Sequence, residues 1–124
     1  VLKTRISQIK TVKKGEYIGY GTAGRADRDT TIAIVPIGYA DGYARVFGKG
    51  RGFMGLHDHQ VPTIGNICMD VTMLDVTGIS CFEGNTVVVF GENPTIEDLA
   101  EWAHTIPYEI LTSVSQRVSR IFIG

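Results

Sequence analysis

The sequence predicts a small, mainly β domain: an antiparallel β-barrel with one or two short helices near the C-terminus. Three observations support this class. Glycine makes up 15 of the 124 residues, against roughly 7% in an average protein, which indicates many tight turns. Apolar and β-branched residues occur in short runs between glycines and polar residues, as in strands joined by turns. Helical periodicity begins only after residue 95. The length fits one domain with a real core, but is short for a complete cofactor enzyme.

The first half of the chain contains two predicted strands. Residues 2–12 mix β-branched and charged residues in rough alternation, which predicts one half-exposed strand. Residues 13–16 form a turn, and three glycines in residues 17–24 argue against a regular helix there. Residues 30–37 form an almost continuous apolar run, typical of a strand buried on both faces and ending at Pro36. A long glycine-rich loop follows over residues 38–55.

The second half predicts a hairpin and three further strands. Residues 53–56 and 60–64 flank His57-Asp58-His59, which we predict as the tip of the hairpin. Residues 67–76, 85–91 and 118–123 are predicted strands. We expect the core of the domain to include Ile32, Ile34, Val87, Val89 and Phe122.

Two helices are predicted between these last strands. The first has Thr95 as its N-cap and Asp98 as the capping-box partner, and its apolar face consists of Ile96, Leu99, Ala100 and Ala103. Pro107 ends this helix and opens a second short one, whose inward-facing residues are expected to be Ile110, Leu111 and Val114.

Composition excludes several classes of protein. The net charge of −1 provides no general attraction to nucleic acid or to anionic lipid. Cys68 and Cys81 are too few for a disulfide framework and suit a reducing cytoplasm. No apolar stretch approaches the roughly 18 residues of a membrane span, and the first residues lack the pattern of a signal peptide. Because the chain opens directly into a strand, we expect it to be part of a longer protein.

Three motifs occur in a fixed order. Tyr20 lies in Glu16-Tyr17-Ile18-Gly19-Tyr20-Gly21-Thr22-Ala23-Gly24, and Tyr39 follows nineteen positions later in Pro36-Ile37-Gly38-Tyr39-Ala40-Asp41-Gly42-Tyr43. The third motif is Gly65-Asn66-Ile67-Cys68-Met69-Asp70, and the chain ends with Arg117-Val118-Ser119-Arg120-Ile121-Phe122. Over nearly its whole length, this chain resembles the C-terminal β-domain of the alanine racemase family, whose enzymes use pyridoxal phosphate.

The resemblance implies that residues 1–124 are one C-terminal domain of an enzyme that interconverts L- and D-alanine for peptidoglycan synthesis. In this family the Schiff-base lysine belongs to an N-terminal (β/α)8 barrel, which this chain lacks. None of the chain's lysines stands in a sequence context typical of such a residue. The family acts as a head-to-tail dimer in which this domain reaches the partner's barrel. The isolated domain is therefore expected to be inactive and to hold no cofactor.

The resemblance also implies roles for four residues. Tyr20 is the base that takes the α-proton of L-alanine, Tyr39 lies near the substrate, and the backbone N–H of Met69 binds the substrate carboxylate. At the position of Gln116 the family commonly has a tyrosine that contacts the cofactor phosphate, and a glutamine N–H can still donate to that phosphate. If these roles hold, Tyr20, Tyr39 and Met69 should meet at one exposed, apolar rim of the domain.

Other interpretations remain open from the residues alone. Asp41 and Tyr43 also fit structural roles, Asp41 in a turn. The substrate could be another amino acid, such as serine or lysine, because the side-chain pocket is shared with the barrel. A stand-alone binding module for nucleic acid is a further alternative, since cations and aromatic residues alternate in residues 43–53, at Tyr43, Arg45, Phe47, Lys49, Arg51 and Phe53. The acidic excess of the whole chain argues against it.

A metal site is the last alternative considered. His57 and His59 flank Asp58 at the predicted hairpin tip, where both imidazoles could be presented together. A metal site needs three or four ligands, and His104 is the one other histidine. We therefore expect a solvated turn and no metal.

Overall fold

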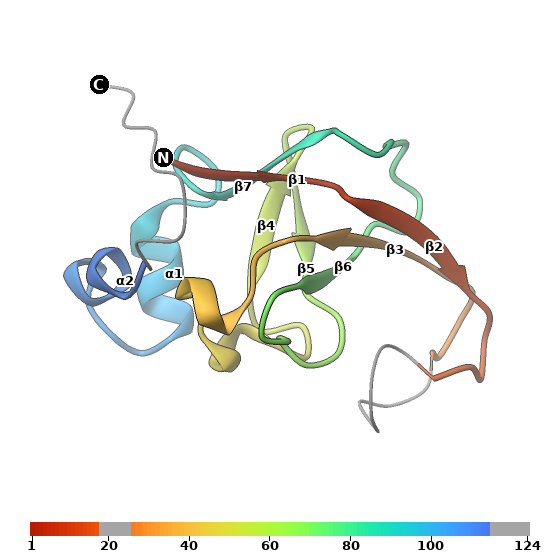
Figure 1. The fold of residues 1–124 in the computed structure, drawn as a ribbon, viewed down its shortest axis with the longest axis horizontal. Coiled ribbons are helices and arrows are strands. Elements are labelled where there is room, and N and C mark those ends of the chain that lie inside the picture. Colours follow the sequence, from red (N-terminus) through yellow and green to blue (C-terminus); the bar gives the residue numbers. More distant parts are fainter. Residues whose placement is uncertain (18–25, 115–124) are drawn as a thin grey trace.

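A computed structural model describes residues 1–17 and 26–114, and in this part the chain folds into antiparallel sheets and two short helices (Figure 1). One sheet has the order β1 (Leu2–Arg5), β7 (Thr86–Phe90), β4 (Phe53–Leu56), β5 (His59–Pro62). The other has the order β2 (Gln8–Val12), β3 (Thr30–Val35), β6 (Thr72–Asp75). Two 3-10 turns, η1 (Tyr39–Asp41) and η2 (Arg45–Phe47), lie in the loop after β3. The helices are α1 (Ile96–Trp102) and α2 (Pro107–Ser113).

The predicted strand over residues 2–12 is divided into β1 and β2, so its prediction as one strand is wrong. The N–H of Ile6 donates to Asn85 O at 3.0 Å, beside β7, whereas the N–H of Ser7 donates to Ile34 O at 2.8 Å, in β3. Successive N–H groups of an extended chain point to opposite sides. The chain therefore leaves one sheet and enters the other between these two residues.

The expected closed barrel is not found among the described residues, which form two sheets instead. Besides the β1–β2 connection, the sheets are joined by one bridge between Thr63 and Leu74. The N–H of Ile64 donates to Met73 O at 2.9 Å, and at Gly65 (φ +70°) the chain turns away into a loop. Pairing between the β5 side and β6 stops there, so within residues 1–17 and 26–114 no continuous ladder closes a barrel.

The main core lies between the sheets and α1. It is formed by buried apolar side chains that include Leu2, Val35, Ile37, Met54, Leu56, Val61, Leu74, Val87, Val89 and Leu99. β3 is buried on both faces, as predicted: Ala33 and Val35 belong to the main core, and Ile32 to a second cluster with Val12, Ala26 and Met73. The prediction that Ile34 belongs to the core is wrong: its side chain is only half-buried and packs against the second cluster. Phe122 lies outside the described residues.

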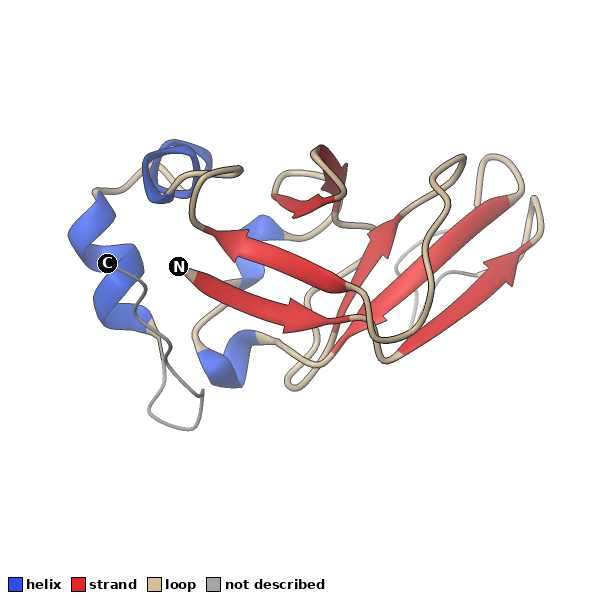
Figure 2. Ribbon diagram, turned by 90° about the horizontal axis from the view of Figure 1, so that it is seen from above, coloured by secondary structure: helices blue, strands red, loops and turns tan. Residues whose placement is uncertain are grey.

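The helices lie together at one end of the domain, away from the β2–β3 end (Figures 1 and 2). The capping box of α1 is confirmed: Asp98 N donates to Thr95 Oγ1 at 3.1 Å, and Thr95 N donates to Asp98 Oδ2 at 3.0 Å. In α2, Ile110 packs against the core, but Leu111 is 43% exposed, because adjacent helical residues point about 100° apart. Among the described residues, α1 and α2 have seven residues each, so neither helix could span a membrane.

The predicted hairpin is confirmed as β4 and β5, which pair from Phe53–Pro62 to Leu56–His59. Its tip is one residue shorter than expected, since His59 already belongs to β5. His57 and Asp58 both have positive φ, 49° and 66°, as a two-residue type I′ turn requires. Both side chains are exposed, as expected of a solvated turn.

Candidate functional site

Two loops meet beside the sheets and form a surface that we call the rim, consisting of Gly38–Gly42 and Cys68–Asp70. The N–H of Tyr39 donates to Cys68 O at 3.0 Å, and the N–H of Ala40 donates to Met69 O at 3.0 Å. These bonds align segments that lie about thirty positions apart in the sequence. The side chains of Tyr39 and Met69 remain 43% and 52% exposed. The structure therefore brings together two of the predicted site residues, at the surface.

The close contact between the two loops depends on Gly38. A Cβ atom at this position would lie 2.2 Å from Cys68 O and 2.5 Å from Met69 O. Both are backbone atoms, which cannot move aside as the end of a flexible side chain can. Glycine is required here because any side chain would push the loops apart.

The buried carboxylate of Asp41 fixes the conformation of the first loop, Gly38–Gly42. Its side chain is buried, at 6% exposure, and Oδ2 accepts a hydrogen bond of 2.9 Å from the N–H of Gly38. This bond spans three residues and closes η1, as the acidic residue of a capping box closes the start of a helix. Gly42 (φ +104°) ends the turn. Asp41 is thus a turn residue whose carboxylate fixes the backbone that carries Tyr39.

The second loop is held by polar contacts at both ends. Thr72 in β6 donates from Oγ1 to Ile37 O at 2.6 Å, and its side chain is fully buried. The N–H of Cys68 donates to Val71 O at 3.1 Å, closing a tight turn around Met69. The rim is therefore anchored at Ile37, two residues after the end of β3, and at Thr72, the first residue of β6.

Two groups on the rim, the N–H of Met69 and the ring of Tyr39, belong to exposed residues. Within the described residues, the N–H of Met69 donates no hydrogen bond. The ring of Tyr39 has the guanidinium of Arg45 over it, 5.8 Å from the ring centre to Cζ. A cation over an aromatic face is attracted by the ring quadrupole, so Arg45 restrains the ring. The rim thus presents a backbone donor beside an oriented phenol.

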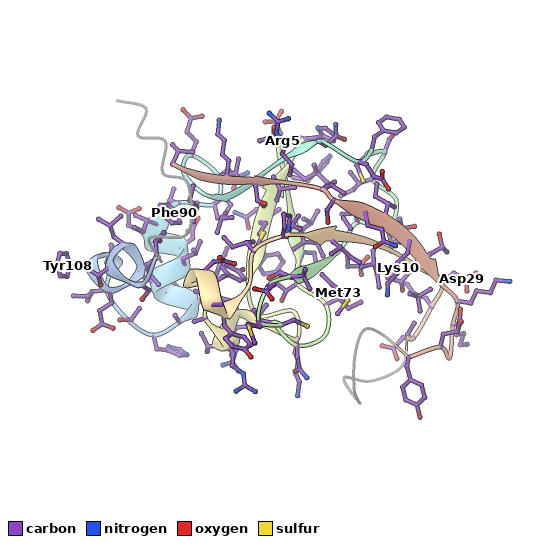
Figure 3. The ribbon with its side chains drawn as sticks, viewed as in Figure 1. Arg5, Lys10, Asp29, Met73, Phe90 and Tyr108 are labelled. Atoms are coloured by element: carbon purple, nitrogen blue, oxygen red, sulfur yellow. The ribbon has the colours of Figure 1, made fainter. Side chains whose placement is uncertain are left out.

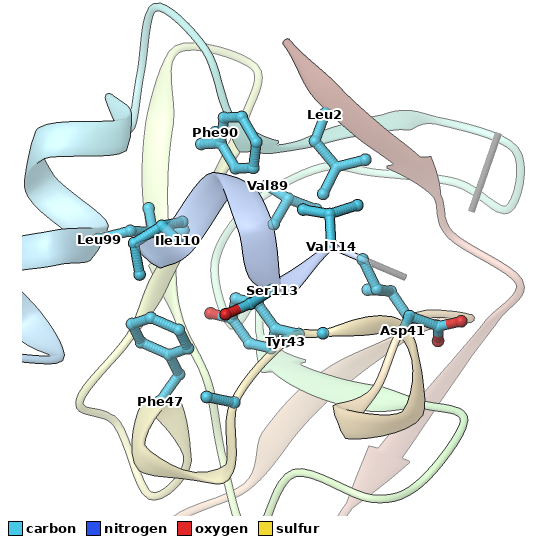
Figure 4. Close-up of a pocket in the computed structure, with 13 residues that line it drawn as sticks. Leu2, Asp41, Tyr43, Phe47, Val89, Phe90, Leu99, Ile110, Ser113 and Val114 are labelled. Carbon is cyan, nitrogen blue, oxygen red and sulfur yellow. The ribbon is translucent and has the colours of Figure 1, made fainter. Parts of the chain in front are cut away.

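A small cavity lies behind the rim (Figure 4). Tyr43, 3% exposed, stacks on Phe47 with the ring centres 4.7 Å apart, and burial raises the pKa of the Tyr43 hydroxyl. This hydroxyl has no hydrogen-bond partner among the described residues. The cavity is lined mainly by apolar side chains and has a volume of about 30 Å³, enough for one or two water molecules. It is too small for an amino acid, so we place no substrate there.

The other predicted site residues, Tyr20 and Gln116, lie outside the described residues. The ends of the segment that contains Tyr20 are described. Ala26 donates to Glu16 O at 2.9 Å, and Gly15 donates to Ala26 O at 2.9 Å. These bonds extend the β2–β3 pairing and bring the two ends of the segment together at the end of the second sheet.

Sequence reasoning missed how Gly38 and Asp41 shape the rim. A detectable signal existed: an Asp three residues after a glycine can bond back to the N–H of that glycine, as in a capping box. The close contact of Gly38 with the other loop had no local signal. It depends on residues 68 and 69, whose position only the fold determines.

The described residues offer little that could hold a cofactor or a metal. Lys3, Lys13, Lys14 and Lys49 are exposed, and Lys10, labelled in Figure 3, is half-buried in β2. None lies in an enclosed pocket that would favour a covalent bond to a cofactor. In residues 1–17 and 26–114, no three His, Cys, Asp or Glu side chains are grouped as a metal site.

Comparison with known proteins identifies relatives over almost the whole chain. The family profile "Alanine racemase, C-terminal domain" matches residues 1–122. Alanine racemase 1 of Clostridium acetobutylicum is 39% identical over 98% of this chain, and alanine racemase of Deinococcus radiodurans is 40% identical over 96%. The chain spans about a third of the length of these relatives, 33% and 34%.

Solved structures show the same fold. Alanine racemase from Bartonella henselae, with covalently bound pyridoxal phosphate, superposes with a TM-score of 0.91 at 32% identity. It covers 98% of this chain, which corresponds to 34% of that protein. Alanine racemase from Clostridium difficile, in complex with cycloserine, gives a TM-score of 0.86 at 38% identity over 94% of this chain and 31% of its own.

Proposed function

This chain belongs to the family of alanine racemase C-terminal domains, and from this premise we propose that its full-length protein interconverts L- and D-alanine with pyridoxal phosphate. Residues 1–124 would be the C-terminal domain, preceded by a cofactor-binding (β/α)8 barrel. The observation that carries the proposal is the rim, where two loops are hydrogen-bonded to each other. One loop carries Tyr39, and the other carries the N–H of Met69. Catalytic sites of (β/α)8 barrels lie at the carboxyl ends of their strands, so the rim would face that end of a barrel.

The substrate carboxylate is the natural ligand for the N–H of Met69. This N–H donates no hydrogen bond within the described residues. Hydrogen bonds to an ionised acceptor, such as a carboxylate, are shorter and stronger than those to a neutral one. This contact requires a backbone position and no particular side chain. Tyr39 beside it, with its ring under Arg45, would limit the space around the substrate.

Tyr20 would act as the base on one face of the substrate. Pyridoxal phosphate supplies an electron sink that stabilises negative charge at the α-carbon. The phenol of Tyr20 would take the α-proton of L-alanine and return it when D-alanine reacts in the opposite direction. A phenol with the ordinary pKa near 10 is a weak base at neutral pH, so a nearby cation or hydrogen-bond donor must favour the phenolate.

The cofactor would be held mostly by residues outside this chain. The exposed or half-buried positions of its lysines do not suit the residue that carries the cofactor, which agrees with a lysine on the barrel. Gln116 would offer its side-chain N–H to the cofactor phosphate. In a head-to-tail dimer, the rim would face the barrel of the partner subunit, so each site would combine two chains.

A cytoplasmic location and a role in peptidoglycan synthesis complete the proposal. Both cysteines, Cys68 and Cys81, are free thiols, which suits a reducing compartment. D-alanine as the product would serve the synthesis of cell-wall precursors. Serine or lysine as the substrate is the alternative within the same chemistry. Racemisation rates measured by circular dichroism for all three amino acids would identify the preferred one.

The decisive experiment is Tyr20→Phe in the full-length enzyme, with Tyr39→Phe as the matched control. Removing one hydroxyl leaves the ring in place and deletes the proton-transfer group. We expect kcat from L- to D-alanine to fall by roughly 10²–10⁴-fold, as for other acid–base groups, with unchanged thermal unfolding. A wild-type rate for Tyr20→Phe together with a slow Tyr39→Phe variant would assign the base to the other tyrosine.

A second experiment tests the division of the site between domains. The chain of residues 1–124 is mixed with pyridoxal phosphate and borohydride, and the mass of the product is measured. We expect no stoichiometric lysine adduct and no racemase activity. A single modified lysine at full occupancy would contradict the proposal that the cofactor-bearing lysine lies on the barrel.

A further inference from the structure

Two described stretches, residues 13–17 and 26–29, precede and follow the segment that contains Tyr20, and we call them the stem. Backbone hydrogen bonds between the two halves of the stem continue the pairing of β2 with β3. Tyr20 is four positions beyond Glu16, and an extended chain spans at most about 3.5 Å per residue, so the two Cα atoms are within roughly 14 Å of each other. The orientation of the stem therefore limits where Tyr20 can lie.

Two carboxylates close the stem on itself. Glu16 Oε1 accepts a hydrogen bond of 2.7 Å from the N–H of Lys13, and Asp29 Oδ1 accepts one of 2.9 Å from the N–H of Lys14. Hydrogen bonds to an ionised acceptor are stronger than those between neutral groups. The bond of Asp29 also crosses from one half of the stem to the other. The stem is thus held together by its own polar contacts.

One side of the stem is attached to β6. Ala26 is 4% exposed and belongs to the second core cluster together with Met73 of β6. Arg28 pairs with the next residue on the same face of that strand, since its Nη2 lies 3.3 Å from Asp75 Oδ2. β6 begins three residues after Met69. This strand therefore connects the stem to the loop of the rim that carries Met69.

The carboxylate of Asp75 is fixed before Arg28 reaches it. Its Oδ1 accepts hydrogen bonds from the N–H and the hydroxyl of Thr77, at 3.0 and 2.6 Å. Thr77 Oγ1 in turn accepts a bond of 3.0 Å from the N–H of Thr31 in β3. The side chain of Arg28 is 67% exposed, and such a pair contributes little to stability. What the pair defines is a direction, because its acceptor is held in place by two strands.

We propose that Arg28 and Asp75 are positioning residues for Tyr20, an inference that rests on the proposed function of Tyr20 as the base for L-alanine. Their ion pair fixes the angle of the stem against β6. It thereby sets the distance between the phenol of Tyr20 and a substrate bound at Met69. Proton transfer requires the base within hydrogen-bond reach of the proton, and a displacement of about 1 Å can cost on the order of 100-fold in rate.

The test uses the full-length enzyme saturated with pyridoxal phosphate, as Arg28→Gln, Asp75→Asn and the double variant. We expect kcat from L- to D-alanine to fall about tenfold in each, with the KM unchanged. The double variant should be no slower than either single one, because all three break the same contact. Arg28→Lys, which keeps the positive charge, should recover most of the rate.

Kinetic isotope effects separate positioning from a general structural effect. The primary effect with α-deuterated L-alanine should rise in Arg28→Gln, because Tyr20 breaks that bond. The effect with α-deuterated D-alanine should not rise, since inversion requires that its α-proton leave from the opposite face. Arg5→Gln is the matched control: it removes an exposed cation from β1, labelled in Figure 3, and should leave the rate and both isotope effects unchanged.

Combination with Tyr20→Phe distinguishes the possible failures. Once the hydroxyl of Tyr20 is absent, Arg28→Gln should cause no further loss of rate. An equal loss with and without that hydroxyl, or a wild-type rate for Arg28→Gln beside a slow Tyr20→Phe variant, would overturn the positioning role alone. A wild-type rate for Tyr20→Phe would overturn the proposed function as well.

Discussion

Two buried polar side chains lie two positions apart in the loop after β3, and they differ in their partners. Asp41, 6% exposed, accepts a hydrogen bond from Gly38 and belongs to the rim. Tyr43, 3% exposed, lies in the core behind the rim, and its hydroxyl has no partner among the described residues. The first half of the loop is thus shaped by polar bonds and the second half by packing.

The difference explains how one loop can serve both the surface and the core. Polar bonds from Asp41 and to the backbone of Cys68 and Met69 hold the rim without burying Tyr39. Beyond Gly42, the rings of Tyr43 and Phe47 gain enough apolar burial to tolerate one unsatisfied hydroxyl. The position of Tyr39 at the surface therefore depends on the hydrogen bonds of the rim, and the stability of the fold depends on the buried rings of Tyr43 and Phe47.

The largest effect is expected from Gly38→Ala, which tests the close contact of the two loops. The added methyl group would overlap backbone oxygens at 2.2 and 2.5 Å, so we expect a loss of about 3 kcal/mol in the free energy of unfolding. Urea unfolding measures it. Gly78→Ala is the control: its methyl meets no atom within 4 Å, and the positive φ of 81° costs about 1 kcal/mol. Equal losses in both variants would refute the contact.

Asp41→Ala should have the next largest effect, because it leaves the N–H of Gly38 buried without this acceptor. We expect about 2 kcal/mol of destabilisation. Asp41→Asn retains an acceptor oxygen and the volume of the side chain, so its loss should be less than half as large in the same urea assay. If the two variants were equally destabilised, the negative charge of Asp41 would matter more than its hydrogen bond to Gly38.

Tyr43→Phe should change stability in the opposite direction. It removes a buried hydroxyl without a partner and keeps the ring stacked on Phe47, so we expect a gain of about 1 kcal/mol. Differential scanning calorimetry would show a higher Tm. Tyr39→Phe, at an exposed ring, should leave the Tm unchanged. A lower Tm for Tyr43→Phe would mean that a water molecule in the adjacent cavity satisfies the hydroxyl.

The smallest effect concerns Asp75, a carboxylate closer to the surface than Asp41. Burial raises the pKa of Asp75, but hydrogen bonds from Thr77 and the charge of Arg28 outweigh it and lower the pKa below its usual value. Because the pKa of Asp75 is lower in the folded state, its carboxylate stabilises the fold at pH values above the unfolded-state pKa. This stabilisation is lost as the pH falls through the folded-state pKa. Arg28 is 67% exposed, so we expect less than about 1 kcal/mol.

Unfolding free energies of the wild type and Asp75→Asn, measured between neutral and strongly acidic pH, test this contribution. The two proteins should differ most at neutral pH and converge as Asp75 becomes protonated. A difference that stays constant down to the lowest pH would show that the charge of Asp75 has no part in it.

Elements that depend on neighbouring residues could be predicted from the sequence. The capping box of Thr95 and Asp98, the burial of β3 on both faces and the hairpin at His57 and Asp58 are set by local patterns, and all three are present. The division of β1 from β2 could not be predicted, because it depends on the acceptors of two successive N–H groups, Asn85 O for Ile6 and Ile34 O for Ser7, which lie far away along the chain. The incorrect prediction for Leu111 arose from assigning two adjacent helical residues to one face.

The sequence by itself determined the family, the mainly β class and the candidate residues, because motif order and periodicity are properties of the chain alone. Only the tertiary structure decided that Tyr39 and Met69 share a rim, that Gly38 must lack a side chain, and that the rings of Tyr43 and Phe47 are buried. The first two depend on contacts between residues about thirty positions apart along the chain, and the third depends on packing in the core. A local pattern in the sequence does not indicate which distant segments the hydrophobic core brings into contact.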